Sequence, residues 1–247
     1  MALRKNGSKS LLLIAVLFLT FFFVFSLKTS AETTQETNTE NPFVYLETPE
    51  NYINYLKNYD KEDAASFQIP EQEINATVND AKKTLEDFLE LSYDDQVKFL
   101  DYMRNPQKLL TETFEGNDPN LTYEMIESTP SISIFANSRT VSHKGVLTAM
   151  GINWTEYKID GTYEYNSSGA TKHLSTNAYV NRHFNPAVTT TKEGQSGYVS
   201  GGKYYGSGTF NYKIGIIGTD WGIQIGTIII KVEGGAKGKS SGSFYRQ

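Results

Sequence analysis

The sequence predicts an α+β fold, in which an N-terminal bundle of short helices is followed by an antiparallel β-sandwich or barrel-like domain. In residues 43–130, apolar side chains recur at the three- and four-residue steps of amphipathic helices. In residues 131–247, segments rich in Tyr, Thr, Val and Ile alternate with Gly, Ser and Asn turns, which is typical of short strands. Charge changes at the same place: residues 32–130 hold 22 acidic and 7 basic side chains, whereas residues 131–247 hold 6 acidic and 12 basic. We therefore expect an acidic helical domain and a basic Tyr/Gly-rich β-domain.

Residues 1–31 are predicted to be a secretory signal peptide that is cleaved after Ala31. Basic side chains precede an apolar run over residues 11–27, and small residues follow it. The alternative is an uncleaved membrane anchor, because a run of this length is near the lower limit for crossing a bilayer core of about 30 Å. We expect a secreted, extracellular protein, and the composition favours a Gram-positive exporter.

Residues 32–42 are polar and are predicted to be a solvated linker. The first helix is predicted at Thr48-Pro49-Glu50, which supplies a cap, a first-turn proline and an acidic residue. Tyr52, Leu56 and Tyr59 would line its buried face.

A longer helix is predicted to begin near Pro70. Its apolar stripe consists of Val78, Ala81, Leu85, Phe88 and Leu89.

Two further helices complete the predicted bundle. Ser92 with Asp95 resembles a capping box at the start of one. Asn105-Pro106 would end that helix, because proline disfavours helical geometry in the residue before it. A last short helix would be closed by Gly116.

The β-domain contains five clear strand patterns, with turns at Ser167-Ser168-Gly169 and Gly201-Gly202. These strands are predicted over residues 140–150, 157–165, 171–180, 203–214 and 222–232. The last has apolar residues on both faces, which predicts a central strand or one covered on both sides. Residues 234–243 are Gly-, Ser- and Lys-rich and are predicted to form a loop.

Several kinds of chemistry find little support in the sequence. The absence of cysteine excludes disulfides, thiolate metal sites and thiol nucleophiles. Gly238-Lys239-Ser240-Ser241-Gly242 matches the nucleophile elbow of serine hydrolases, but only five residues follow it and no catalytic partner can come later. His143, His173 and His183 lack metal-ligand spacing. We therefore expect neither a metal nor a cofactor.

Three carboxylates of the β-domain are the candidates for catalysis. A pair of carboxyl groups roughly 5 to 10 Å apart could hydrolyse a glycosidic bond. The candidates are Glu156, Asp160 and Glu164.

Aromatic and basic side chains of the β-domain are the candidates for ligand binding. Aromatic rings near cations suit both ligand recognition and the interior of a sandwich. The candidates are Trp221, Tyr163, Tyr165, Tyr205, Lys203 and Arg182. Neither an RNA-binding motif nor a dense basic stripe is present, so we expect no nucleic-acid partner.

These patterns lead to one functional hypothesis and two alternatives. We expect a secreted, non-enzymatic protein whose cationic β-domain binds cell-wall polymer or an anionic lipid surface. The acidic half would contact the basic half within the molecule and mask or solubilise it, and a variant is a propeptide released by cleavage between residues 134 and 139. The alternatives are a cell-wall glycan hydrolase that uses the three carboxylates, and a structural or adhesion module.

Overall fold

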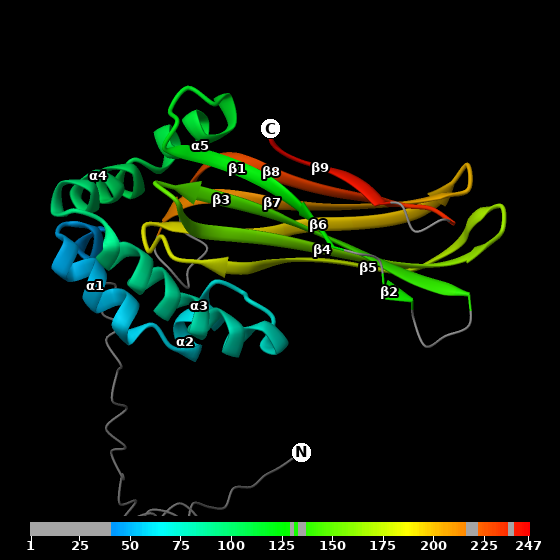
Figure 1. Cartoon of the computed structure of the whole chain (residues 1–247), viewed down its shortest axis with the longest axis horizontal. Helices are drawn as coiled ribbons and strands as arrows, with labels where there is room; N and C mark the ends of the chain where they lie inside the picture. The colour runs from blue at the N-terminus through cyan, green and yellow to red at the C-terminus, as the bar shows by residue number, and fades with distance from the viewer. Residues whose placement is uncertain (1–40, 129–130, 133–136, 216–221, 237–239) are drawn as a thin grey trace, which may run out of the picture. The chain divides into compact units, whose positions relative to one another are not determined.

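The computed structural model describes residues 41–128, 131–132, 137–215, 222–236 and 240–247. The expected signal peptide, the linker up to residue 40 and residues 134–136 of the expected cleavage segment lie outside the described residues. Residues from Thr39 onward form one compact unit. Figure 1 shows its helices beside one end of two layered antiparallel sheets. The predicted α+β fold, with helices before a β-sandwich, is confirmed.

The helical part contains one 3-10 helix and five α-helices among the described residues. They are η1 (Pro42–Leu46), α1 (Pro49–Asn58), α2 (Lys61–Ser66), α3 (Glu71–Glu90), α4 (Tyr93–Arg104) and α5 (Pro106–Glu115).

The predicted helix ends are confirmed because their signals are local. The Thr48 side chain caps α1, and the Ser92 side chain caps α4 by accepting from the Asp95 N–H at 3.2 Å. Gly116 ends α5 in the left-handed region, at a φ of 71°, which costs glycine little. Helix α2 was not predicted, although Asp60 and Asp63 form a capping box at its start.

The buried side of α3 differs from the predicted apolar stripe. Its buried residues are Thr77, Ala81, Thr84 and Phe88, which keep helical spacing. Leu89, expected on this side, is 51% exposed. Two of the buried positions are therefore threonines, and one of them, Thr77, donates to the backbone of a strand.

The strands form two sheets, and all pairings are antiparallel. Sheet A has the order β1-β3-β4-β5, with β2 also paired to β3, and sheet B has the order β6-β7-β8-β9. The strands of sheet A are β1 (Leu121–Glu127), β2 (Ser131–Ile132), β3 (Ser138–Ala149), β4 (Ile152–Asn166) and β5 (Gly169–His183). Those of sheet B are β6 (Val188–Ser200), β7 (Lys203–Gly215), β8 (Gly222–Gly234) and β9 (Ser240–Arg246).

The five predicted strands correspond to β3, β4, β5, β7 and β8, and β8 is central in sheet B. Two expectations need correction. Residues 121–127, which lay within the expected helical domain, form β1 and pair with β3. Residues 240–246, which include the end of the expected loop, form β9 and pair with β8. Small residues suit β9 because a Cβ at Gly242 would collide with the ring of His143.

Helices and sheets share one hydrophobic core, in which Trp154, Tyr157 and Phe210 are buried together with helical side chains. The Tyr52 hydroxyl of α1 donates to the carbonyl oxygen of Phe184 at 3.0 Å. Removal of the helices would therefore expose a large apolar surface of the sandwich.

The side chain of Gln195 on β6 closes the sandwich along the edge strand β5. Its Oε1 accepts from the Ala178 N–H at 2.9 Å, and its Nε2 donates to the Thr176 carbonyl oxygen at 2.8 Å. The amide thus satisfies backbone groups that an edge strand would otherwise leave open. On the opposite side, Phe114 of α5 packs against Tyr123 of β1 and Phe244 of β9.

Gly161 on β4 provides a first test of this packing. A Cβ there would collide with the ring of Tyr204, which is buried and stacked on Tyr163 at 5.1 Å between ring centroids. We expect Gly161→Ala to lower the free energy of unfolding by about 2 kcal/mol, as overpacking does in other cores. Gly194→Ala is the matched control, because a Cβ at Gly194 meets open space. Equal urea midpoints for the two variants would contradict the packing described.

Candidate functional site

Glu156 lies at the centre of a buried ion network on the outer face of sheet A. Its carboxylate is 2.8 Å from Lys144 Nζ and 3.3 Å from Arg182 Nη2. It also accepts from Asn181 Nδ2 at 2.5 Å. The residue is only 3% exposed. Such a charge is tolerated when cations and hydrogen-bond donors surround it.

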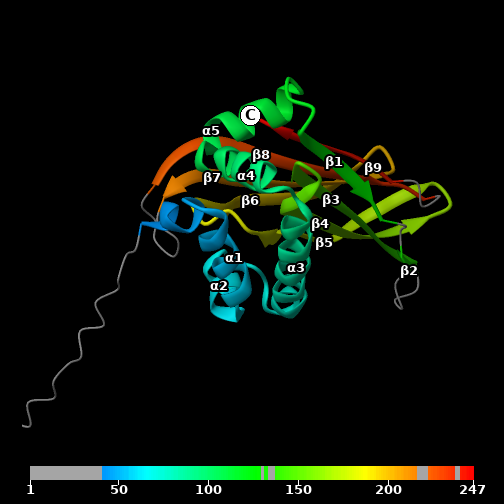
Figure 2. The same cartoon turned by 60° about the vertical axis from the view of Figure 1, so that its left-hand side comes forward.

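Helix α3 supplies further carboxylates to this face, and Figure 2 shows it alongside β4 and β5. Asp80 pairs with Arg182 at 3.0 Å, and Glu73 pairs with Lys158 at 3.5 Å. The Thr77 hydroxyl donates to the Asn181 carbonyl oxygen at 2.8 Å. These polar contacts join the acidic helix to sheet A, and the one made by Thr77 explains the presence of this threonine on the buried side.

Tyr179 connects the Glu73–Lys158 pair to Asp160. Its hydroxyl is 2.9 Å from Glu73 Oε1 and 3.3 Å from Asp160 Oδ2, and it donates toward these carboxylates. Burial, together with the two carboxylates, raises the pKa of Tyr179 far above its usual value, so the phenol stays protonated. Lys158 Nζ lies 5.5 Å from the centre of the same ring. The polar groups of Tyr179, Glu73, Asp160 and Lys158 therefore contact one another.

The three candidate catalytic carboxylates do not meet in one site. Glu156 and Asp160 belong to the network beneath α3, where each already has cationic or phenolic partners. Glu164 lies farther along β4 and pairs with Lys172 at 3.5 Å, with both side chains exposed. Sequence spacing along one strand could not foresee this, because the partners come from β3, β5 and α3.

The three histidines also lie apart, and each has its own surroundings. His183 is buried, and its Nε2–H donates to the Val188 carbonyl oxygen at 3.0 Å, which leaves Nδ1 to accept from the Thr155 hydroxyl at 2.7 Å. Burial lowers the pKa of His183 to about 4. His143 is buried elsewhere in the sandwich, and His173 stacks on Tyr204. Within the described residues, no group of three or more His, Asp or Glu side chains is placed to hold a metal.

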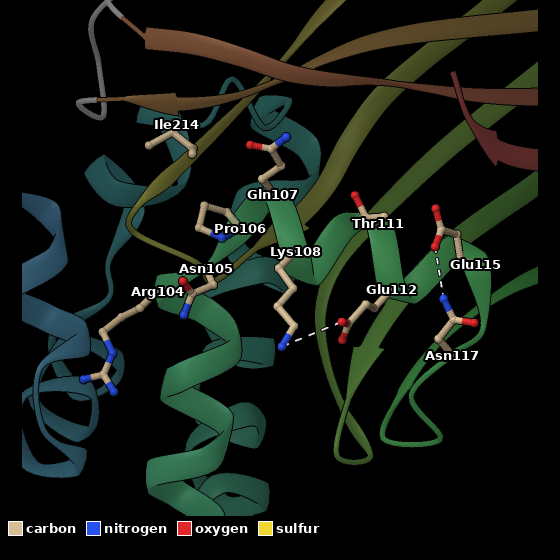
Figure 3. A pocket seen from close by; sticks show the side chains of 10 residues that line it. All are labelled: Arg104, Asn105, Pro106, Gln107, Lys108, Thr111, Glu112, Glu115, Asn117 and Ile214. Atoms are coloured by element: carbon tan, nitrogen blue, oxygen red, sulfur yellow. Dashed lines mark hydrogen bonds and ion pairs between the residues drawn. The ribbon is translucent and has the colours of Figure 1, made fainter.

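A shallow hollow of about 550 Å³ lies at the corner between α4 and α5 (Figure 3). Its charged groups largely satisfy one another: Lys108 pairs with Glu112 at 3.7 Å, and Asn117 donates to Glu115 at 3.0 Å. Arg104 points away and donates to backbone oxygens of η1 and the residue after it. Few polar groups therefore remain free to recognise a ligand there.

The outer face of sheet B is formed by the side chains that point away from the core. On β7, Tyr204, Phe210 and Tyr212 are buried, so the residues that alternate with them point outward. Strand register extends this face across β6, β8 and β9. Its main residues are Ser196, Tyr198, Lys203, Tyr205, Ser207, Thr209, Ile229, Lys231, Glu233, Ser241, Ser243 and Tyr245.

This outer face is open, hydroxyl-rich and carries cations. Of the residues just named, Ile229 alone is buried, at 8% exposure. Tyr198 is 56% exposed and stacks on Tyr205, with ring centroids 5.1 Å apart. Lys231 Nζ lies 5.3 Å from the centre of the Tyr245 ring, and no ion pair joins it to a carboxylate of the described residues. We regard this face as the candidate binding site.

The structure separates the six candidate ligand-binding residues. Tyr205 and Lys203 lie on the outer face of sheet B, and Lys203 pairs with Glu233 at 3.3 Å. Tyr163 is buried against Tyr204 and therefore belongs to the core.

The other three candidates lie elsewhere. The Tyr165 ring is partly buried beneath the Arg139 guanidinium, at 4.3 Å, and Arg182 belongs to the network under α3. Trp221 lies outside the described residues. Tyr198, Lys231 and Tyr245 also lie on the outer face of sheet B but are not among the predicted binding residues. Cross-strand register in β6 and β9, which were not predicted, would have been needed to find them.

The fold and site define a helix-buttressed β-sandwich with one open, cationic and hydroxyl-rich sheet. The chain matches no known protein family, no curated protein and no solved structure. Among the helices of the described residues, none is long and apolar enough to cross a membrane.

Proposed function

We propose that the protein is secreted and non-enzymatic, and that it attaches to an anionic surface of the cell envelope through the outer face of sheet B. The observation that carries this proposal is the unequal pairing of cations on the two sheets. On sheet A, Lys144, Lys158 and Arg182 each contact a carboxylate. On sheet B, Lys231 is exposed and lies over a tyrosine ring instead.

The charge of sheet B supports the same proposal. The outer face named above holds two lysines, Lys203 and Lys231, and one carboxylate, Glu233, which pairs with Lys203. Most carboxylates of the chain lie in the helical half, where α3 directs some of them toward sheet A. Opposite charges attract over about 10 Å at ordinary ionic strength, so an open cationic face favours an anionic partner.

In this proposal the acidic helices remain attached to the β-sandwich and are not removed by cleavage. They neutralise the outer face of sheet A and share its core through contacts such as Tyr52 with Phe184. A propeptide mechanism would have to separate this shared core after cleavage. The proposal therefore keeps the whole chain together on the envelope.

Co-sedimentation with isolated Gram-positive cell walls and with phosphatidylglycerol vesicles tests this proposal. We expect residues 32–247 to bind one of these at low salt and to be released at high salt. Replacing Lys203 and Lys231 together by Gln should weaken binding several-fold and reduce its salt dependence. Lys82→Gln, which removes an exposed lysine of α3, is the matched control. Absence of salt-sensitive binding to both materials would refute the proposal.

A further inference from the structure

We infer that the ligand of the outer face of sheet B is an anionic polysaccharide, and that the stacked pair Tyr198 and Tyr205 holds one of its sugar rings. This inference rests on the function proposed above and deepens it, because it selects sugar polymer over lipid. Three properties of the face carry it: an immobilised aromatic platform, polar groups suited to hydroxyls, and the lack of protruding aliphatic side chains among its described residues.

The two tyrosines form a preorganised platform. They are directly opposite each other on β6 and β7, and their ring planes differ by only 20°. Tyr205 supports one face of the Tyr198 ring, while Tyr198 remains 56% exposed. The C–H groups on one side of a pyranose carry partial positive charge and are attracted to the negative face of an aromatic ring. A ring fixed by its neighbour loses little conformational entropy when a sugar binds.

Polar groups beside the platform match the hydroxyls of a sugar. Glu233 is directly opposite Tyr205, and Lys203 lies 3.3 Å from its carboxylate. Together they offer an acceptor and a donor, and a sugar hydroxyl can act as either. In the next row across the sheet, Ser207 and Ser243 flank Lys231, and Ser196 lies beyond Ser207. This row supplies more hydroxyls and a cation for an acidic group of the polymer.

A lipid surface suits this face less well. Proteins that lie on membranes insert protruding apolar side chains among the acyl chains. The one aliphatic side chain of this face, Ile229, is 8% exposed and does not protrude. The other residues of the face are tyrosines, hydroxyl residues and charged side chains. The chemistry of the face therefore favours a hydrated polymer.

Affinity electrophoresis and calorimetry with four probes test this inference. The probes are polygalacturonate, dextran, polyphosphate and phosphatidylglycerol vesicles. We expect residues 32–247 to bind polygalacturonate more tightly than dextran, which lacks charge, and than polyphosphate, which lacks sugar rings. Tyr198→Ala should weaken polygalacturonate binding about tenfold, which corresponds to the loss of one aromatic contact. Tyr93→Ala, which removes an exposed tyrosine of α4, should leave binding unchanged.

Each other outcome has a definite meaning. If polyphosphate or vesicles bind as tightly as polygalacturonate and Tyr198→Ala has no effect, the polysaccharide inference is wrong and the proposed function stands. If none of the four probes binds at low salt, the polysaccharide inference is wrong, and co-sedimentation with cell walls decides whether the proposed function stands. Circular dichroism of Tyr198→Ala checks that the variant is folded, and Tyr198→Phe, which keeps the ring, should restore most of the affinity.

Discussion

Replacing Glu156 by Gln is expected to lower the free energy of unfolding by about 3 kcal/mol. The substitution keeps the shape of the side chain but removes the carboxylate that Lys144 contacts and leaves Arg182 paired with Asp80 alone. Removing one member of a buried ion network is strongly destabilising because the remaining charge stays desolvated. Urea denaturation of the variant and the wild-type protein measures the difference.

Glu164→Gln is the matched control on the same strand. Its partner Lys172 and the carboxylate itself are both exposed, so the change should stay below about 0.5 kcal/mol. Equal destabilisation by the two substitutions would contradict the network. The pair also tests the hydrolase alternative: loss of a detected lytic activity in Glu156→Gln, with unchanged stability, would identify Glu156 as catalytic rather than structural.

Acidification from pH 7 to pH 4 is expected to remove about 3 kcal/mol of stability through His183 alone. Burial lowers the pKa of His183 to about 4 in the folded protein, against about 6.5 in the unfolded chain. Between these values the unfolded state binds more protons, so stability falls as pH falls. The contribution is complete above pH 6.5 and is lost as the pH approaches 4. The neighbours of the ring, Thr155, Trp154 and Phe67, offer no carboxylate to offset the effect.

The stability difference between wild-type protein and His183→Gln at several pH values isolates this contribution. We expect the variant to be less stable at pH 7 and to lose less stability on acidification. Part of the slope should persist, because burial also lowers the pKa of His143. An NMR titration of the wild-type ring gives a second readout that does not depend on the variant. A His183 pKa near 6.5 would contradict the buried, neutral imidazole.

Local signals in the sequence were sufficient for the helix ends and for five strands. Thr48, Ser92 and Gly116 act through their own backbone neighbours, so the sequence beside them contains the whole interaction. The strands β3, β4, β5, β7 and β8 carry enough β-branched and aromatic residues to be recognised alone. Strand β9 was missed because its Ser and Gly residues resemble a loop. Of these, Gly242 is explained only by tertiary packing, because a Cβ there would collide with the Lys231 carbonyl oxygen and the His143 ring.

The sequence predicted the residue types of the candidate binding face, which are tyrosine and lysine. It did not predict which individual tyrosines and lysines lie on that face. Tyr205 and Lys203 are predicted binding residues and lie on the candidate face, yet Tyr163 from the same predicted set is buried. On β4, Tyr163 alternates in phase with the buried Tyr157 and Ile159, so it faces the core with them. The sequence shows this alternation but does not say which of the two faces of the sheet is covered.

By itself, the sequence determined the α+β class, the order of helices before strands, and the separation of acidic from basic residues. These follow from periodicity, capping and composition, which act over a few neighbouring residues. Only the tertiary structure decided which charges neutralise one another. Asp80 and Arg182 are about a hundred positions apart, and α3 brings them to 3.0 Å. Ion pairing depends on distance in space, so the docking of α3 on sheet A also decided that sheet B keeps its open cationic face.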